Sequence, residues 1–175
     1  MNKYLIDANI FMQTERQYYA FDIAPSFWDM VKNKFLNGSF ILLDKVYDEL
    51  MAGADKKKQD NWDKFSEFFD SLKTKKLKGE KHIKEYADVM NFIYSSSFFT
   101  DTAKHSWMGD KVADPFIIAC AINTKSTVVT FENRKRPHKN SLPVTALKIP
   151  DICDLMDVKC IDLMTLFREI GFSFK

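Results

Sequence analysis

The stretch VADPFIIACAINTKSTVVTFE, residues 112–132, decides the fold because it joins a buried helix to a buried strand. The helical part is apolar, and it has Pro115 in its first turn, where proline is well tolerated. The strand part, residues 126–130, is a short β-branched run typical of a buried strand. One acid, Asp114, opens the helix, and another, Glu132, follows the strand. The sequence therefore raises the question of whether these acids are a cap and a loop residue or parts of one site.

On both sides of this stretch the chain alternates short apolar strands with helices. Strands are expected at residues 3–7, 39–43, 126–130 and 158–162, and helices at 25–38, 45–53, 55–72, 80–99, 112–123, 149–158 and 163–172. Continuously apolar strands are typical of a parallel sheet covered on both faces. Their alternation with helices favours right-handed crossover connections. We therefore predict an α/β fold, a three-layer α/β/α sandwich with a short parallel sheet.

Composition limits the class of protein. With 175 residues, 46% of them hydrophobic, the chain is expected to form one domain with a proper core. A net charge of +2 argues neither for nor against nucleic acid. Three cysteines without C-x-x-C spacing disfavour a disulfide framework and fit a cytoplasmic protein. We expect no signal peptide and no membrane segment, because the longest apolar run is far shorter than the ~20 residues that a spanning helix needs.

Four acids and one amide are expected to meet at one edge of the predicted sheet. Asp7 ends the first strand, Asn9 stands two residues later, and Glu132 follows the third strand. Asp114 opens a helix that starts near the carboxyl ends of the strands, and Glu49 lies about a turn and a half into the helix after the second strand. Ligands of open α/β sheets bind outside these carboxyl ends. The topology permits the five side chains to converge there.

Clustered carboxylates favour a divalent metal. They repel one another and raise one another's pKa, and a hard cation with oxygen ligands relieves the repulsion. Such a cation, Mg²⁺ or Mn²⁺, supports phosphodiester hydrolysis. The three histidines have no H-x-x-x-H spacing, which disfavours zinc hydrolysis. No Gly-rich phosphate loop is present, so a nucleotide cofactor lacks support.

Each acid also has a simpler interpretation. Asp114 stands where a helix N-cap is expected, and Asp7 is placed to start an Asx-turn. Glu49 fits a solvated helix residue, and Glu132 fits an ion pair with the arginines that follow it. Asp110 is the main rival for a role in the site, because it lies near Asp114 in sequence.

Four segments resemble the motif regions of PIN-domain nucleases in order and spacing: LIDAN, the Glu49 of VYDELMAG, ADPFIIACA and VVTFE. The tail KIPDICDLMDVKCIDLMTLFREIG resembles an uncharacterised PIN-like subgroup often found as the toxin of a bacterial toxin–antitoxin pair. The resemblance implies a catalytic site in which Asp7, Glu49, Asp114 and Glu132 hold Mg²⁺ or Mn²⁺, with Asn9 at the polar position. One departure is that the fourth motif more often carries Asp than Glu.

The resemblance implies a metal-dependent endoribonuclease that acts as a toxin. An activated water would attack the scissile phosphorus and leave a 5′-phosphate and a 3′-hydroxyl. The implied partners are an RNA substrate and a cognate antitoxin, with a homodimer possible. Residues 1–175 are expected to form one PIN-like domain, and residues 55–110, which match no motif, to form a helical clip inserted over the site.

Alternatives stay open for the function and for one loop. The same residues fit an inactive PIN-like module that binds RNA or protein, and they also fit a structure-specific DNA nuclease. The basic loop NRKRPHK, residues 133–139, either holds an RNA backbone or is a solvated loop.

Overall fold

The computed structural model contains a short, fully parallel sheet. It describes residues 2–55, 61–137 and 142–173. Within these ranges the strands lie in the order β2-β1-β3-β4, and all neighbouring strands are parallel. The strands are β1 (Tyr4–Ile6), β2 (Phe40–Ile41), β3 (Thr127–Val129) and β4 (Cys160–Ile161). Leu5 at the centre pairs with Ile41 on one side and Val128 on the other.

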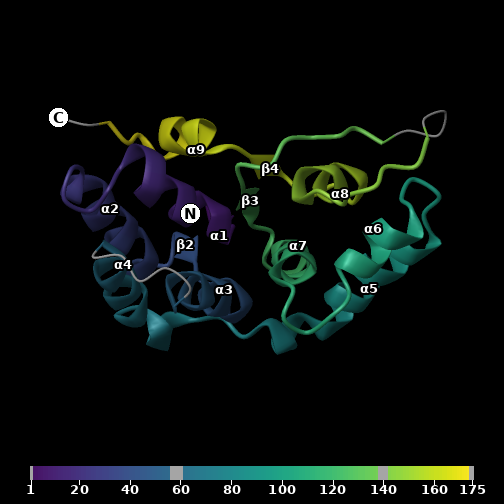
Figure 1. The fold of residues 1–175 in the computed structure, drawn as a ribbon, viewed down its shortest axis with the longest axis horizontal. Coiled ribbons are helices and arrows are strands. Elements are labelled where there is room, and N and C mark those ends of the chain that lie inside the picture. Colours follow the sequence, from purple (N-terminus) through teal and green to yellow (C-terminus); the bar gives the residue numbers. More distant parts are fainter. Residues whose placement is uncertain (1, 56–60, 138–141, 174–175) are drawn as a thin grey trace.

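Helices cover both faces of the sheet (Figure 1). The chain runs one way along the sheet from β1 to β2, and the other way from β2 through β3 to β4. Because parallel crossovers are right-handed, the helices that connect β1 to β2 lie on one face of the sheet, and those that connect β2 to β3 and β3 to β4 lie on the other. One face carries α1 (Ala8–Gln13), α2 (Pro25–Leu36) and α9 (Leu163–Ile170), and the other carries α7 (Ala113–Thr124) and α8 (Ile149–Leu155). The predicted three-layer α/β/α fold class is confirmed.

The middle of the chain is helical where it is described. It contains α3 (Asp44–Asp55), α4 (Asn61–Asp70), two 3₁₀ turns, η2 (Lys73–Lys75) and η3 (Gly79–His82), then α5 (Ile83–Ser95) and α6 (Asp101–Ser106). Part of the helix predicted over residues 55–72 falls on residues 56–60, outside the described ranges. The predicted end of the preceding helix at Gly53 is wrong, because α3 continues to Asp55. The role of this region as a clip over the site stays a prediction.

The continuous helix predicted over residues 80–99 is wrong. After α5 the backbone turns extended at Ser96, and a second helix begins only at Asp101. The cause is a distant strand-like contact: Val144 N donates to Phe98 O at 2.9 Å, and Thr100 N donates to Val144 O at 3.1 Å. Backbone groups bound to Val144 are not available for a helical ladder. Also unpredicted were α1 and the π-helical turn η1 (Thr14–Tyr18) that extends it.

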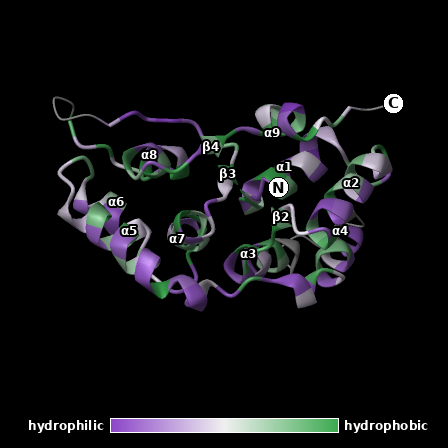
Figure 2. Cartoon of the chain, turned by 180° about the vertical axis from the view of Figure 1, so that it is seen from behind, coloured by the Kyte–Doolittle hydropathy of each residue, from purple (hydrophilic) through white to green (hydrophobic). Residues whose placement is uncertain are grey.

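The core is one continuous cluster that packs against both faces of the sheet. Helix α7 is buried almost all round, as its apolar sequence requires, and Phe116 stacks on Tyr86 of α5 with ring centroids 4.2 Å apart. On the other side an aromatic cluster joins the first helices to α4, and in it Phe69 packs edge-on against Phe11 at 5.0 Å. Figure 2 shows hydrophilic residues along α4 and α5 and along the connection that leaves β3. In the described part of the chain, none of the helices combines the length and apolarity needed to span a bilayer.

Phe69→Ala is expected to lower the free energy of unfolding by about 3–5 kcal/mol, because the ring is fully buried and its loss leaves a cavity. Urea denaturation followed by circular dichroism measures the change. Tyr94→Ala is the control, since Tyr94 is exposed on α5 and should cost much less. Equal destabilisation by the two variants would contradict the described packing of α4.

Candidate functional site

The candidate site lies between the carboxyl ends of β1 and β3. The crossovers that leave these two neighbouring strands run to opposite faces of the sheet, and such a reversal opens a crevice where α/β proteins bind ligands. Asp7 follows β1 directly, is only 4% exposed, and donates its backbone N–H to Val129 O at 3.0 Å. Its carboxylate accepts a hydrogen bond of 2.7 Å from the Thr130 hydroxyl. It stands at the N-cap position of α1 but makes no side-chain cap hydrogen bond there.

Thr130 is the centre of this hydrogen-bond network. Its hydroxyl donates to Asp7, and it accepts from the Asn9 side-chain amide at 3.2 Å and from the Glu132 backbone N–H at 3.1 Å. One donor and two acceptor positions are the full capacity of a hydroxyl. The Asn9 carbonyl in turn accepts from the Phe131 backbone N–H at 3.2 Å. Thr130 was not among the residues predicted from the sequence; the available signal was a hydroxyl at the end of an apolar strand.

Asp114 stands at the second position of α7, not at its cap. The cap position belongs to Val112, and no side chain caps this helix, so the capping interpretation of Asp114 is wrong. Its pKa is raised from an ordinary value of 3.8 to about 8, mainly by burial and also by the charges of Asp7, Glu132 and Glu49, while Lys148 acts to lower it.

The carboxylates act on one another at this edge. The pKa of Asp7 is raised to about 7, mainly by burial, with smaller contributions from the charges of Glu49 and Glu132, while the hydrogen bonds from Thr130 and the Asn9 backbone act to lower it. Glu49 lies on α3 and its side chain is exposed, yet partial burial of its carboxyl among protein atoms raises its pKa as well. The structure thus brings the four predicted acids close enough for their charges to interact. Metal-ligand and catalytic roles for them stay predictions.

Glu132 is already engaged by helix α8. Its Oε1 accepts from Lys148 Nζ at 2.5 Å, and its Oε2 accepts from the Ile149 backbone N–H at 2.7 Å, at the start of the helix. A carboxylate is favoured at a helix N-terminus. The predicted pairing of Glu132 with the following arginines is wrong, because Arg134 binds Asp154 through two hydrogen bonds of 2.7 and 3.1 Å.

The donor chemistry suits a hard divalent cation. The side chains at this edge offer carboxylate oxygens, and three of the carboxyls have raised pKa values that a cation would lower. In the described ranges, no three His, Cys, Asp or Glu side chains are already arranged as a metal-binding group. Mg²⁺ takes only one or two carboxylates directly and keeps several waters. Asp7 and Asp114 would meet that requirement, with Glu49 available to orient waters, whereas both carboxylate oxygens of Glu132 already accept from Lys148 and Ile149.

The rival acid Asp110 lies in a neighbouring cavity of about 320 Å³, together with Glu49, Lys45 and Lys111. It is exposed, and it is not among the groups that raise the pKa of Asp7 or Asp114. The structure therefore places Asp110 beside the acid cluster and not within it.

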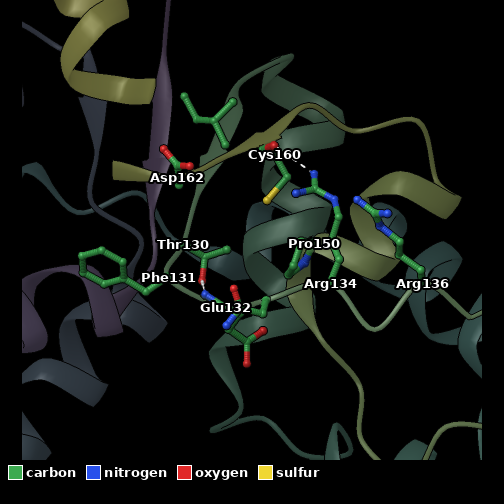
Figure 3. A pocket seen from close by; sticks show the side chains of 10 residues that line it. Thr130, Phe131, Glu132, Arg134, Arg136, Pro150, Cys160 and Asp162 are labelled. Atoms are coloured by element: carbon green, nitrogen blue, oxygen red, sulfur yellow. Dashed lines mark hydrogen bonds between the residues drawn. The ribbon is translucent and has the colours of Figure 1, made fainter. Parts of the chain in front are cut away.

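The connection after β3 is held by a buried acid. Asp151 of α8, which is 2% exposed, accepts the backbone N–H groups of Lys135 at 2.9 Å and Arg136 at 3.0 Å. Figure 3 shows Arg134 and Arg136 side by side near Cys160. Residues 138 and 139 of the predicted basic loop lie outside the described ranges. Asp151 had no predicted role; the available signal was an acid in the first turn of a helix beside a basic segment.

The stability of the metal-free protein is expected to fall as pH rises from about 4 through about 8. The folded state holds protons on Asp7 and Asp114 that the unfolded chain releases near its ordinary pKa of 3.8. Because the unfolded state binds fewer protons in this window, the free energy of unfolding decreases with pH. Asp114→Asn should flatten the dependence, as measured by urea denaturation in EDTA. A wild-type stability that rises over the window would contradict the burial of these carboxyls.

Comparisons with known proteins agree with this architecture. A chain of the crystal structure of VapBC2 from Rickettsia felis bound to a DNA fragment from their promoter has the same fold, with a TM-score of 0.55 and 14% identity. The match covers 91% of this chain and 97% of that chain, and at such identity it shows the fold alone. A comparison with curated proteins found no significant match. The model of the family described as a domain of unknown function (DUF4411) matches residues 4–174, and the chain therefore belongs to the DUF4411 family.

Proposed function

We propose that this protein is a metal-dependent endoribonuclease of the PIN class. One observation carries the proposal: four acids from separate segments of the chain interact through their charges at the switch point of a parallel sheet. Such a desolvated acid cluster is costly for a fold to maintain and is typical of functional sites. The shared fold with a chain of VapBC2 and the four motifs in PIN-like order support the same reading.

The chain's own groups would prepare the site for Mg²⁺ or Mn²⁺. Asp7 and Asp114 would hold the ion, and Thr130 keeps the Asp7 carboxylate in one orientation. Asn9 fixes the backbone at Phe131, and thereby the start of the segment that carries Glu132. When bound, the ion would supply charge to the scissile phosphate and lower the pKa of the attacking water.

The proposed biological role is that of a toxin with a cognate antitoxin. It rests on the resemblance of the sequence to PIN-like toxins and on the fold shared with a chain of VapBC2, a structure solved with promoter DNA. RNA is the proposed substrate. A homodimer and a cytoplasmic location remain predictions.

A second candidate is a module that binds RNA without cutting it. The observation in its favour is that both carboxylate oxygens of Glu132 are satisfied by Lys148 and Ile149. A fourth acid held in this way is less available to a metal. A DNA nuclease is also compatible with the same acids, so a DNA substrate belongs in the assay.

Replacing Asp7 or Asp114 with Asn is expected to lower the rate of RNA cleavage in Mn²⁺ at least about a hundredfold, because a ligand to the ion is lost. Cleavage of labelled RNA measures the effect, with wild type in EDTA as the metal-free reference. Asp29→Asn is the matched control, an exposed acid on α2. Wild type that binds RNA but never cuts it would favour the binding module, and cleavage confined to DNA would favour the DNA nuclease.

Mn²⁺ is expected to raise the melting temperature of wild type. A ligand at 100 times its dissociation constant adds about 2.7 kcal/mol, which corresponds to roughly 5–10 °C for a chain of this length. Differential scanning fluorimetry measures the shift, with NaCl at matched ionic strength as the control. The double variant Asp7→Asn, Asp114→Asn should lose it. The same shift in wild type and double variant would place the metal elsewhere.

A further inference from the structure

A cavity of about 470 Å³ opens beside the acid site, at the carboxyl ends of β3 and β4. Its two sides differ in chemistry. Phe131 lies on one side and Arg136 on the opposite side, with Thr130 and Glu132 between them (Figure 3). We call this cavity the β3–β4 cleft.

The aromatic side of the cleft is a fixed and accessible platform. Phe131 is half-buried, and its ring packs against Tyr18 with centroids 6.1 Å apart. Tyr18 is 57% exposed, a high fraction for such a large ring. It is the last residue of the π-helical turn η1, a type of turn frequent at functional sites. Aromatic faces exposed in this way are what unpaired bases stack on.

The basic side of the cleft is held in a strained shape. Arg136 has a left-handed backbone with φ of 51°, which is costly for a residue other than glycine. The buried Asp151 carboxylate imposes this shape through the N–H groups of Lys135 and Arg136. Arg134 is occupied, since it binds Asp154 and the Cys160 carbonyl. The Arg136 guanidinium has no protein partner among the described residues, so it is the cation available to a ligand.

The charges within the cleft limit the ligand. Glu132 and Asp162 both line it, and backbone N–H donation from Thr165 lowers the pKa of Asp162, which keeps that carboxyl ionised. An anionic group is therefore favoured only near Arg136. A ligand that joins an anion to a flat aromatic group with N–H donors matches the basic side, the aromatic side and these acids together.

We propose that the β3–β4 cleft binds one unpaired nucleotide of an RNA strand next to the acid site. Its base stacks on Phe131, whose ring packs against Tyr18, and its phosphate contacts Arg136. A duplex cannot bind in the same way, because its bases are already stacked on one another. The identity of the polymer rests on the proposed function, whereas the binding itself does not require cleavage.

Binding is measured in EDTA by fluorescence anisotropy with three probes: a short single-stranded RNA, an abasic strand of equal length, and the duplex. Phe131→Ala should weaken binding of the single strand about fivefold to a hundredfold and leave the abasic strand unaffected. Arg136→Gln should weaken both strands and lower the slope of log affinity against log salt by about 0.7. Phe131→Trp should retain binding, which separates stacking from simple loss of structure.

Two matched controls are available in the chain. Lys125 is an exposed basic residue with a similar left-handed φ of 53°, but it precedes β3 and lies at the other end of the sheet. Tyr94 is an exposed aromatic residue on α5. Lys125→Gln and Tyr94→Ala should bind all three probes like wild type.

Several results would overturn the proposal: no saturable binding of the single strand by wild type, equal affinity for the duplex, equal affinity for the abasic strand, or no effect of the Phe131 and Arg136 variants. A parallel cleavage assay in Mn²⁺ separates this proposal from the proposed function. Base-dependent binding without cleavage retains the cleft and rejects the nuclease. Cleavage by a protein whose binding ignores Phe131 and Arg136 retains the nuclease and rejects the cleft.

Discussion

The hydrogen bond from Thr130 to the buried Asp7 carboxylate is the contact on which the rest of the site depends. It spans 2.7 Å and joins the ends of β1 and β3, the neighbouring strands whose crossovers leave toward opposite faces of the sheet. A carboxylate deprived of water is stable only if donors or cations compensate it. Thr130 provides one donor, and the raised pKa values of Asp7 and Asp114 indicate that compensation within the protein is incomplete. This residual cost is what a divalent cation would relieve.

Two acids connect helix α8 to the segment that follows β3, one from each side of the contact. Glu132 reaches from the end of β3 to the start of α8, where Lys148 and Ile149 bind it. Asp151 reaches from α8 back to the segment after β3 and binds its backbone at Lys135 and Arg136. The extra methylene of Glu132, compared with the Asp usual in the PIN motif, extends its reach toward this helix. The segment from Glu132 to Arg136 is therefore bound to α8 at both of its ends.

The same arrangement gives the acid edge two different neighbours. On one side Asp110, Lys45 and Lys111 line a small cavity with Glu49, and on the other the β3–β4 cleft carries an aromatic and a basic side. A site for a nucleic acid strand needs both a place for chemistry and contacts that hold the strand beside it. Under the two proposals the acids would carry the chemistry and the cleft would hold the strand, so binding and cleavage can be tested separately.

The sequence alone determined the parallel three-layer fold, because continuously apolar strands must be covered on both faces. It also determined that Asp7, Asp114 and Glu132 lie near one edge, because acids next to strand ends and helix starts follow the topology. Tertiary structure alone decided the hydrogen-bond partners, such as Thr130 at the centre of the network and Lys148 as the partner of Glu132. It also decided the break before α6, where Phe98 and Thr100 form backbone hydrogen bonds with Val144. Local patterns report burial and propensity. They do not report which distant group will satisfy a given donor or acceptor, and that depends on the completed packing.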